Sequence, residues 1–582
     1  MLKNEKGSTL LVVMLMVFIF SVLGLSIIST SIGGAKRTEV RENEVVDNLE
    51  AIKKVNEGVA VIRSYVDKNF DPKEDIREYS QKLNSFIECK SSDNEAICSN
   101  PTKANIENDE DEKRYEITNI SFIDNPDKPG EKLYNISEFE DYSRVLEVSS
   151  EYAPGKYYTQ LVYITAMPSF LKYSIGSRGG LTINGSAYLQ GNIYANKSLS
   201  ISKEAKYTYA SNNYIVKTEL PSFFDEGNNN LMVETGKVKY CENSCYDSDN
   251  SPIEDNWKDQ NVDNIVDLFE PYDPDVSDEK LQFVQVDILN TFFEKLISAG
   301  FDISVIPTDY LIEKSDPLAE NQRILDFTTF IKGQIKKNAD SINGKGFETI
   351  TSFNQFKDIG KSVLYQGDAY IDLDNLNLSK GNWLIIDGNA FFESSGTNQM
   401  SISANILVTG NISFKGKFSI DSTMYVLGNA SVNDVDIEKT DSGSELILMA
   451  QKELNIARFN KFFDPTDPTK INENRVDKIN GYLYTASDAT VYAIGSYIYV
   501  DGGVFAKGNL EVNSFRGKVN SLPCSNNNDD SNCVRAADVN SSRLIIKNNK
   551  RLFLNQVQGL PRVDKLDVMT DLMKKGAKTK VE

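Results

Sequence analysis

Six cysteines are the residues whose type and spacing most clearly predict chemistry. An even number in close pairs predicts three small disulfides, formed in an oxidising compartment. Free thiols in loops are the alternative, and a Cys-only zinc site is a weaker one, because only one pair approaches metal-ligand spacing and no second pair matches it. The expected pairs are Cys89 with Cys98, Cys241 with Cys245, and Cys524 with Cys533.

Histidine is absent from the 582 residues, which removes several kinds of active site. Without it the chain cannot form a Ser-His-Asp or Cys-His site, a His-ligated zinc site or an imidazole general base. The sequence has no Walker loop, and no Gly-x-Gly-x-x-Gly follows a strand and opens a helix, so nucleotide binding has no support. We therefore expect no cofactor.

Four aspartates near residue 370 are the candidates for enzymatic carboxylates. A glycan lyase or hydrolase needs clustered carboxylates on one face, or a pair in acid/base spacing. Aspartate is also common in turns, because its side chain bonds the local backbone. The turn interpretation favours a chain that is not an enzyme, and a carbohydrate-active site stays the alternative. The four residues are Asp368, Asp372, Asp374 and Asp387.

A calcium loop is suggested by oxygen-bearing side chains at alternate positions, Asp247, Asp249 and Ser251. A calcium loop of the EF-hand type needs glycine at its sixth position and glutamate at its twelfth. Those positions hold Pro252 and Lys258 here. We therefore expect a solvated loop and no metal site.

The charge balance excludes another class of function. The formal net charge is −21, from 63 Lys and Arg against 84 Asp and Glu. A nucleic-acid binder carries a basic footprint that this chain lacks, so we expect no nucleic-acid partner. The length predicts several domains.

The N-terminal segment predicts a membrane anchor. From Gly7 to Ala35 no residue is charged, and about 20 apolar residues suffice for a helix to cross a bilayer. A secretory signal has a shorter apolar run and a small-residue cleavage site. Basic residues flank the run on both sides and do not settle its orientation. A disulfide-bearing body belongs outside the cell, which places Met1 in the cytoplasm.

The helical pattern continues beyond the apolar run. No proline interrupts the chain before Pro72, so we expect one helix of about 60 residues, its first half in lipid and its second half amphipathic. The apolar residues expected on one face of the second half are Val45, Leu49, Ile52, Val59, Ile62 and Val66.

These N-terminal residues resemble the class III signal of type IV prepilins. A short charged leader ends at Lys6-Gly7, and Ser8 opens the apolar helix. The resemblance implies that a prepilin peptidase cuts between Gly7 and Ser8, and that Ser8, usually methylated, becomes the first mature residue. Most pilins carry glutamate at the fifth mature position, which here is Val12. This departure is similar to certain minor pilins and tip-capping pseudopilins. A plain anchor that is never processed is the alternative.

A second segment adds to the resemblance. Asn56-Glu57-Gly58 resembles a segment of proteins with a PilX-type N-terminal region. The resemblance implies a minor pilin or pseudopilin with other pilin subunits and the prepilin peptidase as partners. Its place would be the cell membrane, with an extracellular ectodomain that enters or caps a pilus. Its role would be assembly, tip capping or adhesion of a type IV-like pilus or a related secretion or competence filament. A surface polysaccharide is a further candidate partner.

The remaining chain predicts a mainly β protein behind the long helix. Residues 36–170 should form the amphipathic helix and a small α+β head. Gly-Asn recurs at a period near 20 residues between short alternating strands, which predicts a right-handed parallel β-helix over 172–210 and 362–520. A β-sandwich or a stack of hairpins is the alternative. The repeats begin at Gly191, Gly388, Gly410, Gly428 and Gly508.

Two further regions have a different pattern. Residues 211–361 should form an inserted, α-rich domain, with one helix through Leu281–Leu296 and another through Leu318–Ile335. Residues 521–582 should form strands and a polar, lysine-rich tail that is solvated or touches an acidic wall polymer.

The sequence therefore predicts a membrane-anchored, surface-exposed structural protein that is like a minor pilin. A membrane-anchored, carbohydrate-binding or carbohydrate-active β-helix protein is the second hypothesis, and a surface scaffold without a filament is the third.

Overall fold

The computed structural model describes most of the chain and carries side chains. The described residues are 8–70, 82–83, 86, 115–120, 122–124, 132–135, 143–165, 168–209, 212–224, 229–276, 286–303, 305–310, 312–342, 347–353, 360–379, 382–394, 399–438, 445–457, 478–494, 497–516, 542–549, 560, 567–570 and 574–577.

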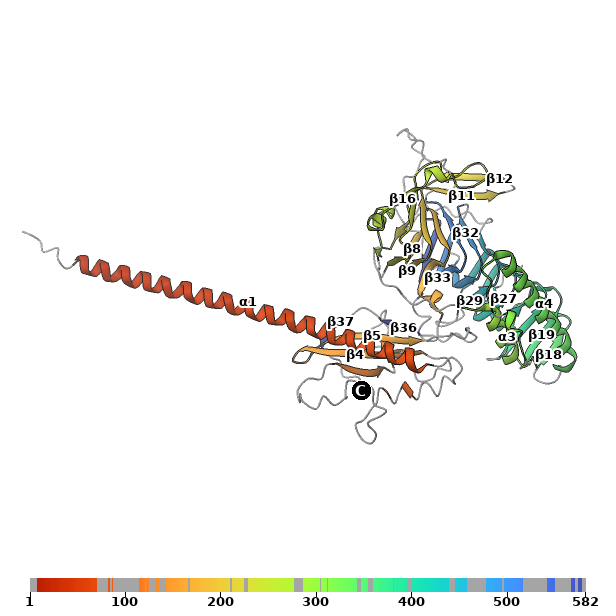
Figure 1. The fold of residues 1–582 in the computed structure, drawn as a ribbon, viewed down its shortest axis with the longest axis horizontal. Coiled ribbons are helices and arrows are strands. Elements are labelled where there is room, and N and C mark those ends of the chain that lie inside the picture. The colour runs from red at the N-terminus through yellow and green to blue at the C-terminus, as the bar shows by residue number, and fades with distance from the viewer. Residues whose placement is uncertain are drawn as a thin grey trace, which may run out of the picture. The chain divides into compact units, whose positions relative to one another are not determined.

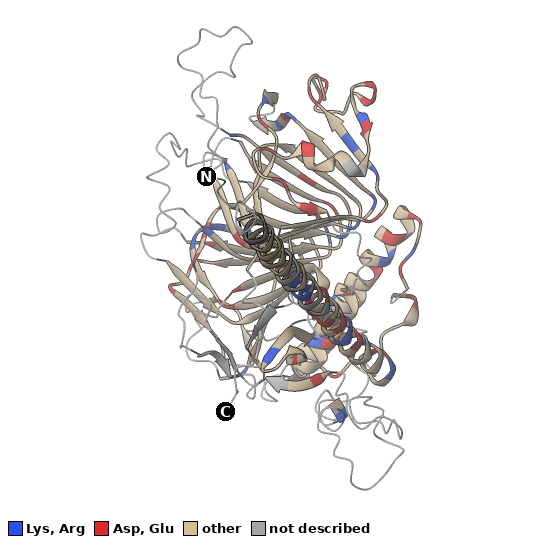
Figure 2. Cartoon of the chain, turned by 90° about the vertical axis from the view of Figure 1, so that its left-hand side faces the viewer, with Lys and Arg blue, Asp and Glu red and all other residues tan. Residues whose placement is uncertain are grey.

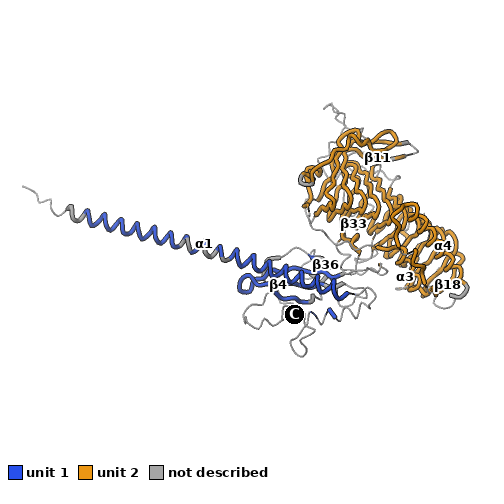
Figure 3. Tube along the Cα trace, in the orientation of Figure 1, with its two compact units in different colours: residues 1–138, 142–165, 568–582 blue, residues 139–141, 166–567 orange. Residues whose placement is uncertain are grey.

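The chain divides into two compact units (Figure 3). Unit 1 contains residues 1–138, 142–165 and 568–582, and unit 2 contains residues 139–141 and 166–567. Unit 1 therefore holds both ends of the chain. Unit 2 is inserted between two strands of unit 1, and each unit is described separately below.

Unit 1 combines one long helix, α1 (Ser8–Asn69), with a small antiparallel sheet (Figure 1). The sheet has the strand order β1-β4-β5-β36, and β37 also pairs with β5. The expected long N-terminal helix is confirmed by α1. The strands of unit 1 are β1 (Glu116–Ile120), β2 (Phe122–Asp124), β3 (Lys132–Asn135), β4 (Ser143–Ala153), β5 (Lys156–Thr165), β36 (Asp567–Thr570) and β37 (Lys574–Ala577), of which β2 and β3 form a separate pair.

The C-terminal strands correct one expectation. Lys574 and Lys575, which we expected in a solvated tail, lie in β37 and pair with Thr159 and Tyr158 of β5. Backbone pairing at a free sheet edge needs no apolar pattern, so a lysine-rich segment can supply it. The end of the chain thus completes the sheet that begins near its start.

The second half of α1 packs on this sheet, against β4 and β5. Its buried residues recur at the helical spacing of three and four, which explains why one face of the helix is apolar. Of the six residues expected on that face, Val59, Ile62 and Val66 are buried, whereas Val45 and Leu49 are exposed. The sheet therefore covers only the last five turns or so of the helix.

Unit 2 is built on one large sheet whose strands pair in parallel in three columns. In each column the strand of one repeat pairs with the strand of the next, as β19, β22 and β25 do. The fold class is therefore mainly β. The first column, in spatial order, is β18 (Phe347–Ile350), β19 (Ser362–Gln366), β22 (Trp383–Asp387), β25 (Asn405–Val408), β27 (Ser422–Val426), β29 (Leu446–Ala450), β31 (Lys478–Thr485), β33 (Ile498–Ala506), β6 (Tyr173–Ser177), β9 (Asn192–Ala195), β14 (Asn230–Val233) and β17 (Asp275–Val276).

The other two columns follow the same order, and the longer strands β26, β28, β31 and β33 bend to serve two columns. The second column is β20 (Ala369–Ile371), β23 (Ala390–Glu393), β26 (Ile412–Ile420), β28 (Ala430–Glu438), β30 (Leu454–Ala457), β32 (Ala489–Ala493), β34 (Leu510–Ser514), β7 (Gly180–Gly185), β10 (Ser198–Ser202) and β15 (Val238–Cys241), which β16 (Lys258–Gln260) joins antiparallel. The third contains β21 (Asn375–Asn377), β24 (Met400–Ser403), β35 (Leu544–Lys547), β8 (Tyr188–Gln190) and β13 (Ser222–Phe223), and the hairpin of β11 (Glu204–Tyr209) and β12 (Asn212–Lys217) stands apart.

The columns do not follow chain order. β33 pairs with β6, and β34 pairs with β7, so the first repeats of the chain stack on its last ones. The segment 230–276, expected in an α-rich insertion, instead supplies β14 to β17 to the large sheet. Sequence repeats reveal that strands stack but not which repeat is the neighbour of which.

Two helices lie against the first column at the end that carries β18, β19 and β27 (Figure 1). They are α3 (Ile288–Ser298) and α4 (Pro317–Ile342). Phe292 and Phe327 of these helices share one apolar cluster with Trp383 and Tyr425, which point outward from the column. Inward-pointing residues of the three columns form a second, larger cluster. The short 3-10 helices are Ser169–Lys172, Glu254–Asn256, Val262–Leu268 and Thr308–Tyr310.

Candidate functional site

The first part of α1 is an apolar helix with nothing packed on it. The segment Val12–Thr38 spans 27 residues, and the most apolar 18-residue window within it has a mean hydropathy of 2.7 and is not buried. Figure 2 shows the charged residues of α1 confined to its later part. By length and composition this helix can cross a membrane.

Hydroxyl groups within the segment are bonded inside the helix. Ser21 Oγ donates to the carbonyl oxygen of Val17 at 2.7 Å, and Thr30 Oγ1 donates to that of Ser26 at 2.8 Å. Hydrocarbon offers a hydroxyl no partner, so such groups must be satisfied by the helix itself. These serine and threonine residues are therefore compatible with a lipid environment.

The expected processing site lies at the start of this helix. Gly7 lies outside the described residues, whereas Ser8 is the first residue of α1. Val12, which stands at the position of the family's glutamate, is exposed. The geometry of cleavage is thus not described, and the cut between Gly7 and Ser8 stays a prediction.

Between the apolar segment and the sheet, α1 has an exposed apolar stretch. Val45, Val46 and Leu49 are each more than half exposed, although charged residues surround them in sequence. Exposed apolar residues of α1 therefore continue beyond Thr38 as far as Leu49.

Gly58 allows the helix to approach the sheet closely. A Cβ added there would lie 2.6 Å from Cγ1 of Val148 in β4 and 3.0 Å from the ring of Tyr115. A valine methyl and an aromatic ring cannot easily move aside, because β-branched and ring side chains have few rotamers. The residue noticed in the sequence for its family resemblance therefore has a packing role in unit 1.

The Gly-Asn repeats form stacked turns in unit 2. The Asn411 backbone N–H donates to the side-chain oxygen of Asn389 at 2.9 Å, and that of Asn429 donates to Asn411 at 2.8 Å. The backbones of the preceding glycines also touch, since the Gly428 N–H donates to the Gly410 carbonyl at 3.0 Å. A Cβ on Gly428 would lie 2.5 Å from that carbonyl oxygen. Only glycine fits such an approach, which explains the repeat.

Two of the four candidate carboxylates bond to residues of neighbouring turns. Asp368 starts the ladder of turns, because its Oδ1 accepts the Asn389 backbone N–H at 2.8 Å. Asp387 Oδ1 accepts the Thr409 hydroxyl at 3.0 Å. Asp372 lies beside β20 and Asp374 beside β21. Across the described ranges, no three Cys, Asp or Glu side chains come together as a metal site.

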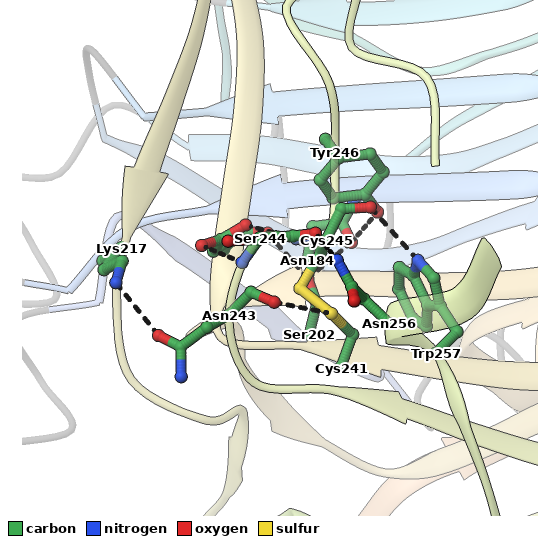
Figure 4. The surroundings of a disulfide bond; sticks show 11 residues. Asn184, Ser202, Lys217, Cys241, Asn243, Ser244, Cys245, Tyr246, Asn256 and Trp257 are labelled. Carbon is green, nitrogen blue, oxygen red and sulfur yellow. Dashed lines mark hydrogen bonds between the residues drawn. A yellow bond between two sulfur atoms is a disulfide. The ribbon is translucent and has the colours of Figure 1, made fainter. Parts of the chain in front are cut away.

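Cys241 and Cys245 lie at disulfide-bonding distance (Figure 4). Both are buried, and the buried carboxylate of Glu204 accepts the backbone N–H groups of Ser244 at 2.8 Å and Cys245 at 2.7 Å. The indole of Trp257 donates to the Cys245 carbonyl at 3.2 Å. The two cysteines thus close a tight loop, and the Glu204 carboxylate fixes the backbone of that loop. Cys89, Cys98, Cys524 and Cys533 lie outside the described residues.

The expected solvated loop at Asp247 is held by its own backbone. Asp247 Oδ1 accepts the backbone N–H groups of Asp249 and Ser251, both at 2.9 Å.

A charged cluster fixes the start of α4. Arg323 donates to both carboxylate oxygens of Glu320 and to the carbonyl of Tyr310. Burial alone would raise the pKa of Glu320, but the bonds from Arg323 and from the Lys314 backbone N–H outweigh it and hold this pKa below its ordinary value. Burial raises the pKa of Asp287, the residue that caps α3.

Known proteins add little to these observations. No protein-family model matches the chain, and no curated protein matches it. A solved structure, that of the competence-associated pilin ComZ from Thermus thermophilus, aligns over 86% of this chain and 95% of its own. Its sequence identity is 11% and its TM-score is 0.23. A TM-score at this level does not establish a shared fold.

Proposed function

We propose that the chain is a membrane-anchored surface protein whose N-terminal helix acts as a pilin-like spine. One observation carries the proposal: Val12–Thr38 is apolar, long enough to span a bilayer and unburied, while the same helix continues into the packed sheet of unit 1. An apolar helix of this length is unstable when its side chains are exposed to water, so it needs lipid or other helices around it.

The proposed mechanism is release followed by helix association. A prepilin peptidase cuts after Gly7, and the helix that begins at Ser8 moves from lipid into a bundle of pilin-type helices. Helix association in lipid depends on packing and interhelical hydrogen bonds. Val12 cannot supply a carboxylate to a neighbouring N-terminal amine, so the chain takes a minor place, at a tip or an initiating complex.

Unit 2 is proposed to be the displayed part of the protein. Its parallel columns support the β-helix interpretation, because strands one repeat apart pair in register along each column. An inserted, rigid body of this kind suits assembly or adhesion outside the cell, with other pilin subunits as partners. No reaction is proposed for it.

Three measurements in the native host test the proposal. Alkaline carbonate extraction should leave the protein in the membrane pellet, and sheared filaments should contain it at low abundance. Val12→Glu should change its incorporation or the filament length. A protein that washes off the membrane, or a variant with unchanged incorporation and length, would contradict the anchor or the minor role, respectively.

A further inference from the structure

One outward face of unit 2 carries an aromatic pair in a row that is otherwise polar. The row runs along the second column, where outward residues of successive strands lie next to one another. Among its ten members only the first two are aromatic. The row is Tyr370, Phe391, Ser413, Ser431, Asn455, Thr490, Glu511, Thr182, Ser200 and Lys239.

The two rings form a stacked pair that is open to solvent. Their centroids are 4.7 Å apart, with planes inclined by 10°. Although one ring rests on the other, Tyr370 is 74% exposed, more than any other aromatic side chain that the structure describes as exposed. Aromatic side chains usually bury most of their area, so an exposed pair marks a surface that contacts something else.

Polar groups border the pair on both sides. Residues 368 to 372 alternate between exposed and buried, so Asp368 and Asp372 project to the same side as Tyr370. On the next strand Asn389 and Glu393 flank Phe391 in the same way. Glu393 is bonded to Lys415 of the third strand at 3.2 Å. The aromatic pair thus lies within a border of carboxylates and an amide.

This arrangement matches the chemistry of a neutral sugar. A pyranose ring presents C–H groups on its face, which pack on an aromatic ring, and hydroxyls at its rim, which donate to carboxylate and amide oxygens. A lipid or an apolar helix would cover the bordering carboxylates and remove them from water, which costs free energy even for charged groups that have a protein partner. The border therefore selects a ligand that is apolar on its face and rich in donors at its edge.

We propose that Tyr370, with Phe391 behind it and Asp368 and Asp372 beside it, binds a pyranose unit of a neutral polysaccharide. The rings provide the stacking surface, and the carboxylates of Asp368 and Asp372 accept bonds from hydroxyls. The polar row of the following strands continues from the site along the column. Membrane anchoring is not needed for this binding, so the site and the pilin-like spine can fail independently.

The test uses the full chain in detergent micelles and three hexasaccharide probes, of β-1,4-linked glucose, N-acetylglucosamine and mannose. Calorimetric titration should detect binding of at least one probe, and Tyr370→Ala should weaken it at least tenfold. Tyr370→Trp should retain it, because the stacking surface remains. Tyr214→Ala is the matched control, since Tyr214 is an exposed aromatic residue of the β11–β12 hairpin.

Hydrogen–deuterium exchange on the unmodified protein provides a reading that needs no variant. The bound probe should protect the peptide that contains residues 368–372 and leave the β11–β12 hairpin unchanged. Binding of none of the three probes overturns the proposal. So does binding that Tyr370→Ala leaves intact, or protection confined to other parts of unit 2.

Discussion

The apolar segment of α1 and the core of unit 2 are similar in composition and opposite in environment. Leu15 and Phe18 are more than half exposed, whereas Leu384 and Phe392 of the large sheet are almost fully buried. In unit 2 every column provides the neighbours that its apolar side chains need. In α1 the described large apolar side chains from Val12 to Leu49 are exposed and pack against no other part of the described chain.

The difference indicates what each region requires from outside. Unit 2 buries most of its described apolar strand residues against one another. The helix exposes a surface that water disfavours, so its stability depends on lipid or on other helices. The described core of unit 2 is packed within the chain, whereas the first part of α1 exposes its apolar side chains.

The largest expected effect separates these two requirements. Leu15→Arg combined with Phe18→Arg should remove the protein from the membrane fraction, because an arginine within the apolar span costs up to about 3 kcal/mol of insertion free energy. Unit 2 should stay folded, as thermal denaturation can check. Leu384→Arg should do the reverse, unfolding unit 2 while the chain stays in the membrane. Loss of both properties in either variant would contradict the separation.

The turns of unit 2 provide the next test. Gly428→Ala should destabilise unit 2 by about 3 kcal/mol, since overpacking against a backbone carbonyl cannot relax. Gly333→Ala is its control: a Cβ there meets nothing within 4 Å, and alanine favours the helix by about 1 kcal/mol. Denaturant titration should show the two changes with opposite signs. Equal stability of the two variants would show that the stacked turns do not require glycine.

In unit 1, Gly58→Ala should loosen the contact between α1 and β4. We expect a loss of about 2 kcal/mol, because Val148 and Tyr115 must shift. The denaturation midpoint of unit 1 should fall while that of unit 2 stays unchanged. Gly24→Ala, which meets nothing within 4 Å in the apolar segment, should leave both midpoints unchanged.

The smallest expected effect concerns acid stability at the start of α4. The pKa of folded Glu320 lies below its ordinary value of 4.5, so its bonds to Arg323 stabilise the fold above that pH and are lost as the pH falls through the folded pKa. Glu320→Gln should therefore lower stability at pH 7 and reduce the loss on acidification. Melting temperatures at pH 7 and pH 3 measure the difference. Asp287 has a raised pKa and acts in the opposite direction, but it is common to both proteins.

The sequence predicted what depends on local pattern. The unbroken apolar and amphipathic runs predicted α1, and the Gly-Asn spacing predicted strands that stack, because glycine is needed where successive backbones touch. It also placed α3 and α4 near their positions, although Leu281 and Val284 of the first predicted helix lie outside the described residues.

What the sequence could not predict depends on contacts between distant segments. Pairing of β33 with β6 joins residues more than 300 apart, and no local signal identifies that neighbour. The same holds for Lys574 against Thr159. The sequence does not indicate Tyr370, because a single exposed aromatic residue forms no periodic pattern. Only the pairing of β20 with β23 brings it against Phe391.

The mature N-terminus of the protein from its native host tests the central claim most directly. Mass spectrometry of the intact N-terminal fragment should find a chain that begins at Ser8, with one added methyl group. That result would establish processing of a pilin-like spine. A chain that still carries residues 1–7 would contradict it and leave a plain membrane anchor.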